Sequence, residues 1–221
     1  MSQHFQSVVS IGPQCLTSSM LQRAELKAFS GPFDWIFSSI DMVCDCIESD
    51  FADLLNIDYL KPIPEHRRPD PSLGFANHLL YRERYGLDAI FNHYDPRQPE
   101  RYAYFRRCVK RMRAVLAAPR PQLLIAMAQF EAFQSTAIAR LFHLLDDRAP
   151  NVAAWIIAVA PPAGAQSLVL TESRGRHAIY EFVGYSTING IRFADERDND
   201  FIAAQLRSMI DLDSRGIDFS L

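Results

Sequence analysis

Short apolar runs alternate with amphipathic segments along much of the chain, and this alternation predicts strands and helices in turn. Runs that are apolar almost throughout have the length of strands buried on both faces, at 7–11, 122–128 and 152–160. Segments with apolar residues at helical spacing follow or separate them, at 16–28, 39–55, 100–117, 133–147 and 196–212. The pattern predicts one α/β domain over residues 1–221, with a mostly parallel or mixed sheet and helices on both faces.

Three further segments complete the predicted organisation. Residues 167–173 and 178–186 predict two more strands, which the short turn at 173–177 can join as a hairpin. Residues 89–93, "AIFNH", predict a short strand that ends at His93. Residues 61–75 hold four prolines and several charges, so we expect a loop inserted into the domain and able to act as a lid.

Composition is that of an ordinary globular protein, with 48% apolar and 22% charged residues. The net charge of -3 gives no global reason to expect nucleic-acid binding. Four cysteines form neither a CxxC pair nor a zinc-finger spacing, so we expect no metal and no cofactor: Cys15, Cys44, Cys46 and Cys108.

The N-terminal residues "MSQHFQ" lack the basic and apolar parts of a signal peptide. No apolar run approaches the ~20 residues that cross a bilayer. We therefore expect a cytoplasmic protein with reduced thiols and no membrane span, and the sequence leaves its oligomeric state open.

Cys15 is the residue most suggestive of chemistry. It follows the first apolar run and a Gly-Pro break, in "SIGPQC", and directly precedes a predicted helix. Ligands of α/β sheets gather at the carboxyl ends of strands, and a helix N-terminus stabilises a thiolate. The same N–H groups can stabilise a developing oxyanion. The alternative is that Cys15 is a buried, inert core residue, as free cysteines often are.

Other nucleophile motifs do not fit the chain. A tyrosine-phosphatase loop needs an arginine six positions after its cysteine, where this chain has Leu21. The sequence contains no GxSxG elbow and no P-loop lysine after Gly12.

The stretch "SIGPQCLTSSMLQR…FSGPFDWIFSSID" resembles the start of a bacterial and viral family of papain-like cysteine peptidases of unknown function. That family opens with an apolar strand, Gly-x-x-Cys, a leucine-containing helix and then Ser/Thr-x-Pro-Phe-Asp-Trp. Its Phe-x-His segment and Arg-rich helix are similar to "IFNHYD" at 90–95 and "YFRRCVKRMRAV" at 104–115. The resemblance covers roughly residues 7–130.

The resemblance implies a cysteine hydrolase in which Cys15 is the nucleophile and His93 the general base. Asp34, within "PFDW", or Asn189 would then orient the imidazole. Substrates implied are an amide, an ester or a thioester, in a peptide or an acylated glycan. The family description also implies an α+β papain-like fold as the alternative. No glutamine lies six residues before Cys15, where papain-like enzymes carry their oxyanion donor.

A non-catalytic binding or scaffold protein is the competing hypothesis, in which Cys15 and "PFDW" only build the core. Among the other histidines, His78 is expected in the core or on the surface and His177 in a turn. The basic face of the helix at 100–117 is expected to be solvated, or else to bind an acidic glycan or phosphate.

Overall fold

The computed structural model describes residues 2–70 and 72–213. Its helices are α1 (Cys15–Arg23), α2 (Ile40–Glu48), α3 (Leu79–Tyr85), α4 (Pro99–Leu116), α5 (Ser135–Arg148) and α6 (Glu196–Met209). Its strands are β1 (Gln3–Phe5), β2 (Ser7–Ser10), β3 (Leu60–Pro62), β4 (Ala76–His78), β5 (Gln122–Gln129), β6 (Val152–Val159), β7 (Ser167–Arg174), β8 (His177–Val183), β9 (Ile188–Asn189), β10 (Arg192–Phe193) and β11 (Ile210–Leu212).

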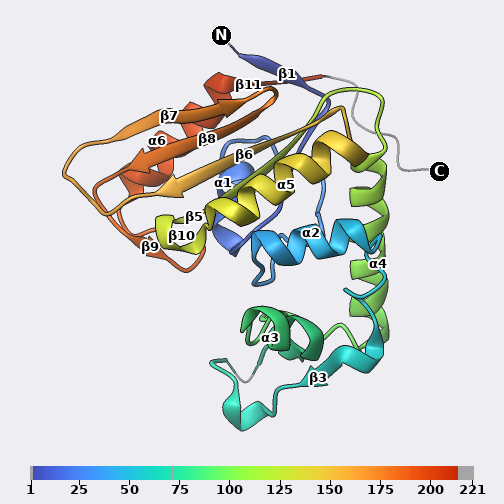
Figure 1. Cartoon of the computed structure of the whole chain (residues 1–221). Coiled ribbons are helices and arrows are strands. Elements are labelled where there is room, and N and C mark those ends of the chain that lie inside the picture. The colour runs from blue at the N-terminus through green and yellow to red at the C-terminus, as the bar shows by residue number, and fades with distance from the viewer. Residues whose placement is uncertain (1, 71, 214–221) are drawn as a thin grey trace.

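A five-stranded mixed sheet with the order β2-β5-β6-β8-β7 forms the centre of the fold (Figure 1). Neighbouring strands are parallel from β2 to β8, and only the edge strand β7 is antiparallel. Strands β7 and β8 form the expected hairpin, and its turn contains Gly175 at a φ of 60°. These features confirm the α/β class and the mixed sheet.

Helices cover both faces of this sheet, which explains why its inner strands are apolar throughout. Along β5, Leu124 and Ala126 join the core cluster under α2, α4 and α5. Leu123, Ile125 and Met127 join the second cluster, under α1 and α6. Successive residues of a strand point to opposite faces, so every side chain of a strand covered on both faces is buried and apolar residues are favoured at each position.

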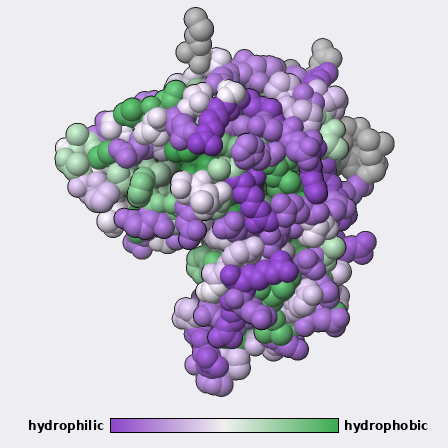
Figure 2. Space-filling view, viewed as in Figure 1, coloured by the Kyte–Doolittle hydropathy of each residue, from purple (hydrophilic) through white to green (hydrophobic). Residues whose placement is uncertain are grey.

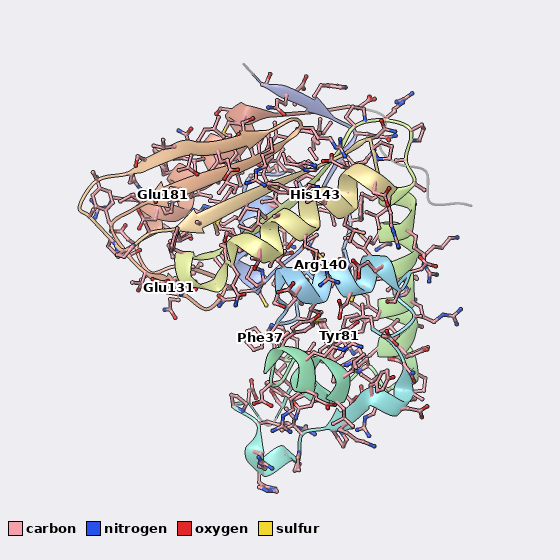
Figure 3. All side chains as sticks on the ribbon, in the orientation of Figure 1. Phe37, Tyr81, Glu131, Arg140, His143 and Glu181 are labelled. Atoms are coloured by element: carbon pink, nitrogen blue, oxygen red, sulfur yellow. The ribbon has the colours of Figure 1, made fainter. Side chains whose placement is uncertain are left out.

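Two of the helices on one face, α2 and α5, are also held together by ion pairs. The guanidinium of Arg140 on α5 lies 2.7 Å from Asp45 and 2.6 Å from Glu48, both on α2, and Figure 3 shows Arg140 between these helices. Much of the surface in the same view is hydrophilic, with hydrophobic patches on the side where β7 lies (Figure 2). Val169 and Leu170 of β7 are about half exposed.

A smaller lobe built from residues 57–94 lies beyond α2 (Figure 1). It contains α3 and the antiparallel pair of β3 and β4. The segment 61–75 is therefore not a plain loop, because β3 extends into it and residues 65–67 form a short 3-10 helix.

Two other expectations were wrong in detail. Residues 89–93 form no strand, and Phe91 makes only an isolated bridge to Ala76. Helix α2 ends at Glu48 rather than near residue 55, because Asp50 and Phe51 adopt left-handed backbone angles of 49° and 60° in φ. Within the described part of the chain, no helix is both long and apolar enough to cross a membrane.

Candidate functional site

Cys15 is the first residue of α1, directly after the turn that leaves β2. The turn passes through Gly12 at a φ of 87°, where an added Cβ would lie 2.1 Å from Ser38 Oγ. Thr17 holds the corner against β5, since its hydroxyl donates to the Gly12 carbonyl and accepts from the Met127 N–H. The strand-turn-helix corner predicted from the sequence is confirmed, and its tight packing leaves Cys15 little freedom to move.

His93 reaches this corner from a loop 78 residues further along the chain, and its Nε2 lies 3.5 Å from Cys15 Sγ. Paired backbone hydrogen bonds between Phe91 and Ala76 anchor the loop just before it. On the other side of the histidine, the backbone of Asp95 passes close to Gly74. A Cβ added to Gly74 would lie 2.7 Å from the backbone nitrogen of Asp95. The loop therefore presents the imidazole to the sulfur from a defined position.

Asn92, next to His93, also contacts the thiol. Its side chain hydrogen-bonds to Cys15 and thereby lowers the pKa of that thiol. The Oδ1 atom of Asn92 is buried and has no hydrogen-bond partner among the described residues. No motif in the sequence points to Asn92, and its position next to His93 is the one signal for it.

Asp34 is buried beside this pair but binds other groups. Its carboxylate accepts a hydrogen bond from the Gly31 N–H at 2.9 Å and forms an ion pair with Lys27 at 2.5 Å. The Lys27 ammonium also lies 5.1 Å from the ring centre of Trp35, and that ring meets His93 edge to face at 6.1 Å. Between described residues, no hydrogen bond joins Asp34 to His93.

Burial sets the protonation of the pair. It raises the pKa of the Cys15 thiol, and the helix N-terminus and Asn92 only partly offset that rise. Burial also lowers the pKa of His93. Both shifts favour a neutral thiol beside a neutral imidazole and so oppose the thiolate that the helix N-terminus favours.

The other candidate residues lie elsewhere. His78 belongs to the core, stacked on Tyr81 at 4.3 Å. His177 is not in a turn: it begins β8, is buried, and accepts a hydrogen bond from the Ala154 N–H. Asn189 is exposed on β9. In the described ranges, no group of three or more histidine, cysteine or acidic residues could hold a metal ion.

Fold and site together define an α/β protein in which a buried cysteine at the carboxyl end of a strand contacts a half-buried histidine. The chain belongs to the family described as "Putative papain-like cysteine peptidase (DUF1796)", which matches residues 6–154, more than half of its length. Comparison with curated proteins and with solved structures found no match.

Proposed function

We propose that this protein is a cysteine-dependent hydrolase that uses Cys15 as its nucleophile and His93 as its general base. The contact of 3.5 Å between Sγ and Nε2 is the observation that carries the proposal. A nucleophile and a base within hydrogen-bond reach of each other are the minimum that this chemistry needs. Membership of a family described as cysteine peptidases supports the same activity.

The neutral state of the pair defines the order of events. Nε2 of His93 accepts the thiol proton as Sγ attacks the carbonyl carbon of an amide, ester or thioester. The tetrahedral intermediate then collapses to an acyl-cysteine, and His93 returns the proton to the departing amine, alcohol or thiol. His93 next takes a proton from water, the resulting hydroxide attacks the acyl-cysteine, and the carboxylic acid leaves as the thiol is reprotonated.

Two donors are available to stabilise the oxyanion of the intermediate. One is the backbone N–H of Cys15 at the start of α1, where the helix dipole favours negative charge. The other is the side-chain amide of Asn92, which already contacts the sulfur. Asn92 thus supplies the donor that papain-like enzymes take from a glutamine upstream of their cysteine.

Asp34 fits a positioning role rather than direct contact with the imidazole. It fixes Lys27, Lys27 lies near the Trp35 ring, and Trp35 packs against one edge of His93. In this proposal the buried ion pair maintains the wall that holds the imidazole toward Cys15. The substrate is a peptide or an acylated glycan, and four free cysteines fit the reducing cytoplasm.

A scaffold protein is the second candidate, and one observation favours it: Cys15 is only 4% exposed. A sulfur so covered reaches a substrate only if the wall around it opens or if the reacting group enters beside the half-buried His93.

Labelling with an electrophile separates the two candidates. The full chain is treated near pH 7 with a peptide-like vinyl sulfone and analysed by intact mass and peptide mapping. The hydrolase predicts a single adduct on Cys15 that disappears in Cys15→Ser and in His93→Ala. Cys108→Ser is the matched control, because Cys108 is buried and its pKa is raised to about 11. An unlabelled Cys15 in the folded protein would favour the scaffold.

A further inference from the structure

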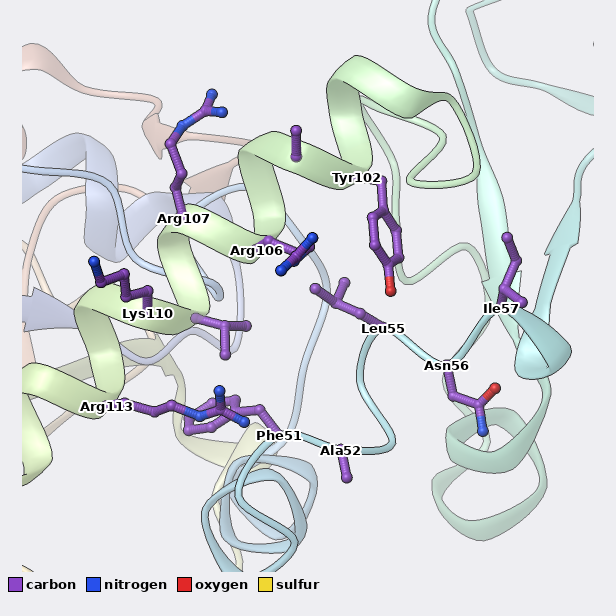
Figure 4. Close-up of a pocket in the computed structure, with 12 residues that line it drawn as sticks. Phe51, Ala52, Leu55, Asn56, Ile57, Tyr102, Arg106, Arg107, Lys110 and Arg113 are labelled. Atoms are coloured by element: carbon purple, nitrogen blue, oxygen red, sulfur yellow. The ribbon is translucent and has the colours of Figure 1, made fainter.

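A groove separate from Cys15 and His93 runs between α4 and the segment 51–57 (Figure 4). We call it the α4 groove. Its volume is about 790 Å³, within the roughly 300–1,000 Å³ typical of small-molecule sites. It is lined by Phe51, Ala52, Leu55, Asn56, Ile57, Tyr102, Ala103, Arg106, Arg107, Val109, Lys110 and Arg113.

Positive charge is concentrated in this groove although the whole chain carries a net charge of -3. Four of its lining residues are cationic and none is acidic. Helix α4 as a whole carries six arginines and lysines and a single acid, Glu100. Such an excess on one helix, facing a hollow, attracts anions and concentrates them there.

Most of these cations are available to a ligand. Arg106, Arg107 and Lys110 are exposed, and none of them forms an ion pair with another described residue. Arg113 differs, since its guanidinium lies 2.9 Å from the Asp50 carboxylate at one end of the groove. Figure 4 shows Arg106 projecting toward the segment 51–57 and Arg107 pointing away from it.

The opposite wall supplies apolar surface. Ile57 is 58% exposed, and the buried Leu55 also lines the groove. Tyr102 extends from α4 toward this wall with its ring between Arg106 and Ile57 (Figure 4). The groove thus has cationic side chains of α4, Arg106 among them, at one side and the apolar side chains of Leu55 and Ile57 at the other.

We propose that the α4 groove binds a small phosphorylated compound that also carries a flat apolar ring. Guanidinium groups bind phosphate oxygens through paired, charge-assisted hydrogen bonds, and Arg106 is placed to make them. The ring lies against Tyr102 and Ile57. The proposal does not rest on the hydrolase activity, because neither Cys15 nor His93 lines the groove.

Calorimetric titration of the full chain tests the proposal, with ADP, pyrophosphate, ribose 5-phosphate and adenosine as separate probes. ADP is expected to bind with one-to-one saturation. Pyrophosphate and ribose 5-phosphate are expected to bind more weakly because they lack the ring, and adenosine is expected not to bind. Ribose 5-phosphate binding as tightly as ADP would overturn the ring part of the proposal.

Variants locate the site. Arg106→Gln and Lys110→Gln are each expected to weaken ADP binding by about tenfold, the effect of losing one charge-assisted contact. Ile57→Asn should weaken the binding of ADP but not of pyrophosphate. Arg192→Gln is the matched control, since Arg192 is exposed on β10 and lies outside the groove. The absence of saturable ADP binding, or equal losses in Arg106→Gln and Arg192→Gln, would overturn the proposal.

Discussion

The sulfur of Cys15 lies 3.5 Å from Nε2 of His93, and burial shifts the pKa values of these two groups in opposite directions. The thiol becomes a weaker acid and the imidazole a weaker base than in water. An ion pair between them is therefore disfavoured at rest, and proton transfer has to accompany attack on a substrate.

Removal of either member of the pair should remove the same step. Once a substrate is identified, Cys15→Ser and His93→Ala are each expected to lower kcat by about 10²–10⁴-fold or more. The double variant should be no slower than either single one, because residues that act as a unit are not additive. Steady-state kinetics gives the measurement, and circular dichroism checks folding. Independent, multiplicative losses would contradict a cooperating pair.

The acid limb of the pH profile should report His93. Its pKa is lowered by burial, so the imidazole stays neutral and able to accept a proton below the ordinary value of 6.5. We expect kcat/KM to hold as pH falls through 6.5 and to decline only as pH passes through the lowered pKa. A decline centred above 6.5 would show that His93 carries a stabilised positive charge instead.

The alkylation profile of Cys15 tests the other half of the pair. Because burial raises the thiol pKa, the rate of labelling by iodoacetamide should rise to its midpoint above 9.0, the ordinary value. A midpoint well below 9.0 would mean that the thiolate forms at rest. Cys15→Ser provides the background rate from the other cysteines.

Asn92→Ala should lower kcat by about 10²–10³-fold with little change in KM, the pattern expected when an oxyanion donor is lost. The same change should raise the Cys15 pKa further, since the amide hydrogen bond lowers it. The shift in the alkylation midpoint separates this role from a purely structural one. Asn77→Ala in β4 is the control for loss of a half-buried amide, because Asn77 accepts from the Ala89 N–H and does not contact the thiol.

Removing only one partner of the buried Lys27–Asp34 ion pair should destabilise the fold more than removing both. Lys27→Met leaves the Asp34 carboxylate, 1% exposed, without its cation, and is expected to destabilise the fold by about 3–5 kcal/mol. The double variant Lys27→Met/Asp34→Leu should recover part of that loss because no buried charge remains. Urea unfolding supplies the free energies. Equal stability of the single and double variants would contradict a tight ion pair.

Limited trypsin digestion should cut first after Arg67. The segment 61–75 is largely exposed, but trypsin acts poorly before proline, which follows both Lys61 and Arg68. Arg68 is also held by hydrogen bonds to the carbonyls of Ile63 and Leu73. Earlier cleavage elsewhere in the folded chain, seen by mass spectrometry, would contradict an exposed insertion within one domain.

The residue pattern was enough to predict the strands of the central sheet and the corner that carries Cys15. Continuous apolar runs predicted β5 and β6, because a strand covered on both faces has no polar side. The Gly-Pro break before Cys15 predicted the strand-turn-helix corner, because the φ of Gly12 is open to few other residues. Both signals lie within a few consecutive residues, so they can be recognised without knowledge of the fold.

Tertiary structure alone decided which side chains surround the sulfur. The approach of Asn92 to Cys15 and the pairing of Asp34 with Lys27 depend on loops brought together by packing, and no local periodicity encodes them. Protonation was likewise decided by the fold. The helix N-terminus visible in the sequence favours a thiolate, but burial opposes it and prevails, because removing a thiolate from water costs more than the end of a short helix returns.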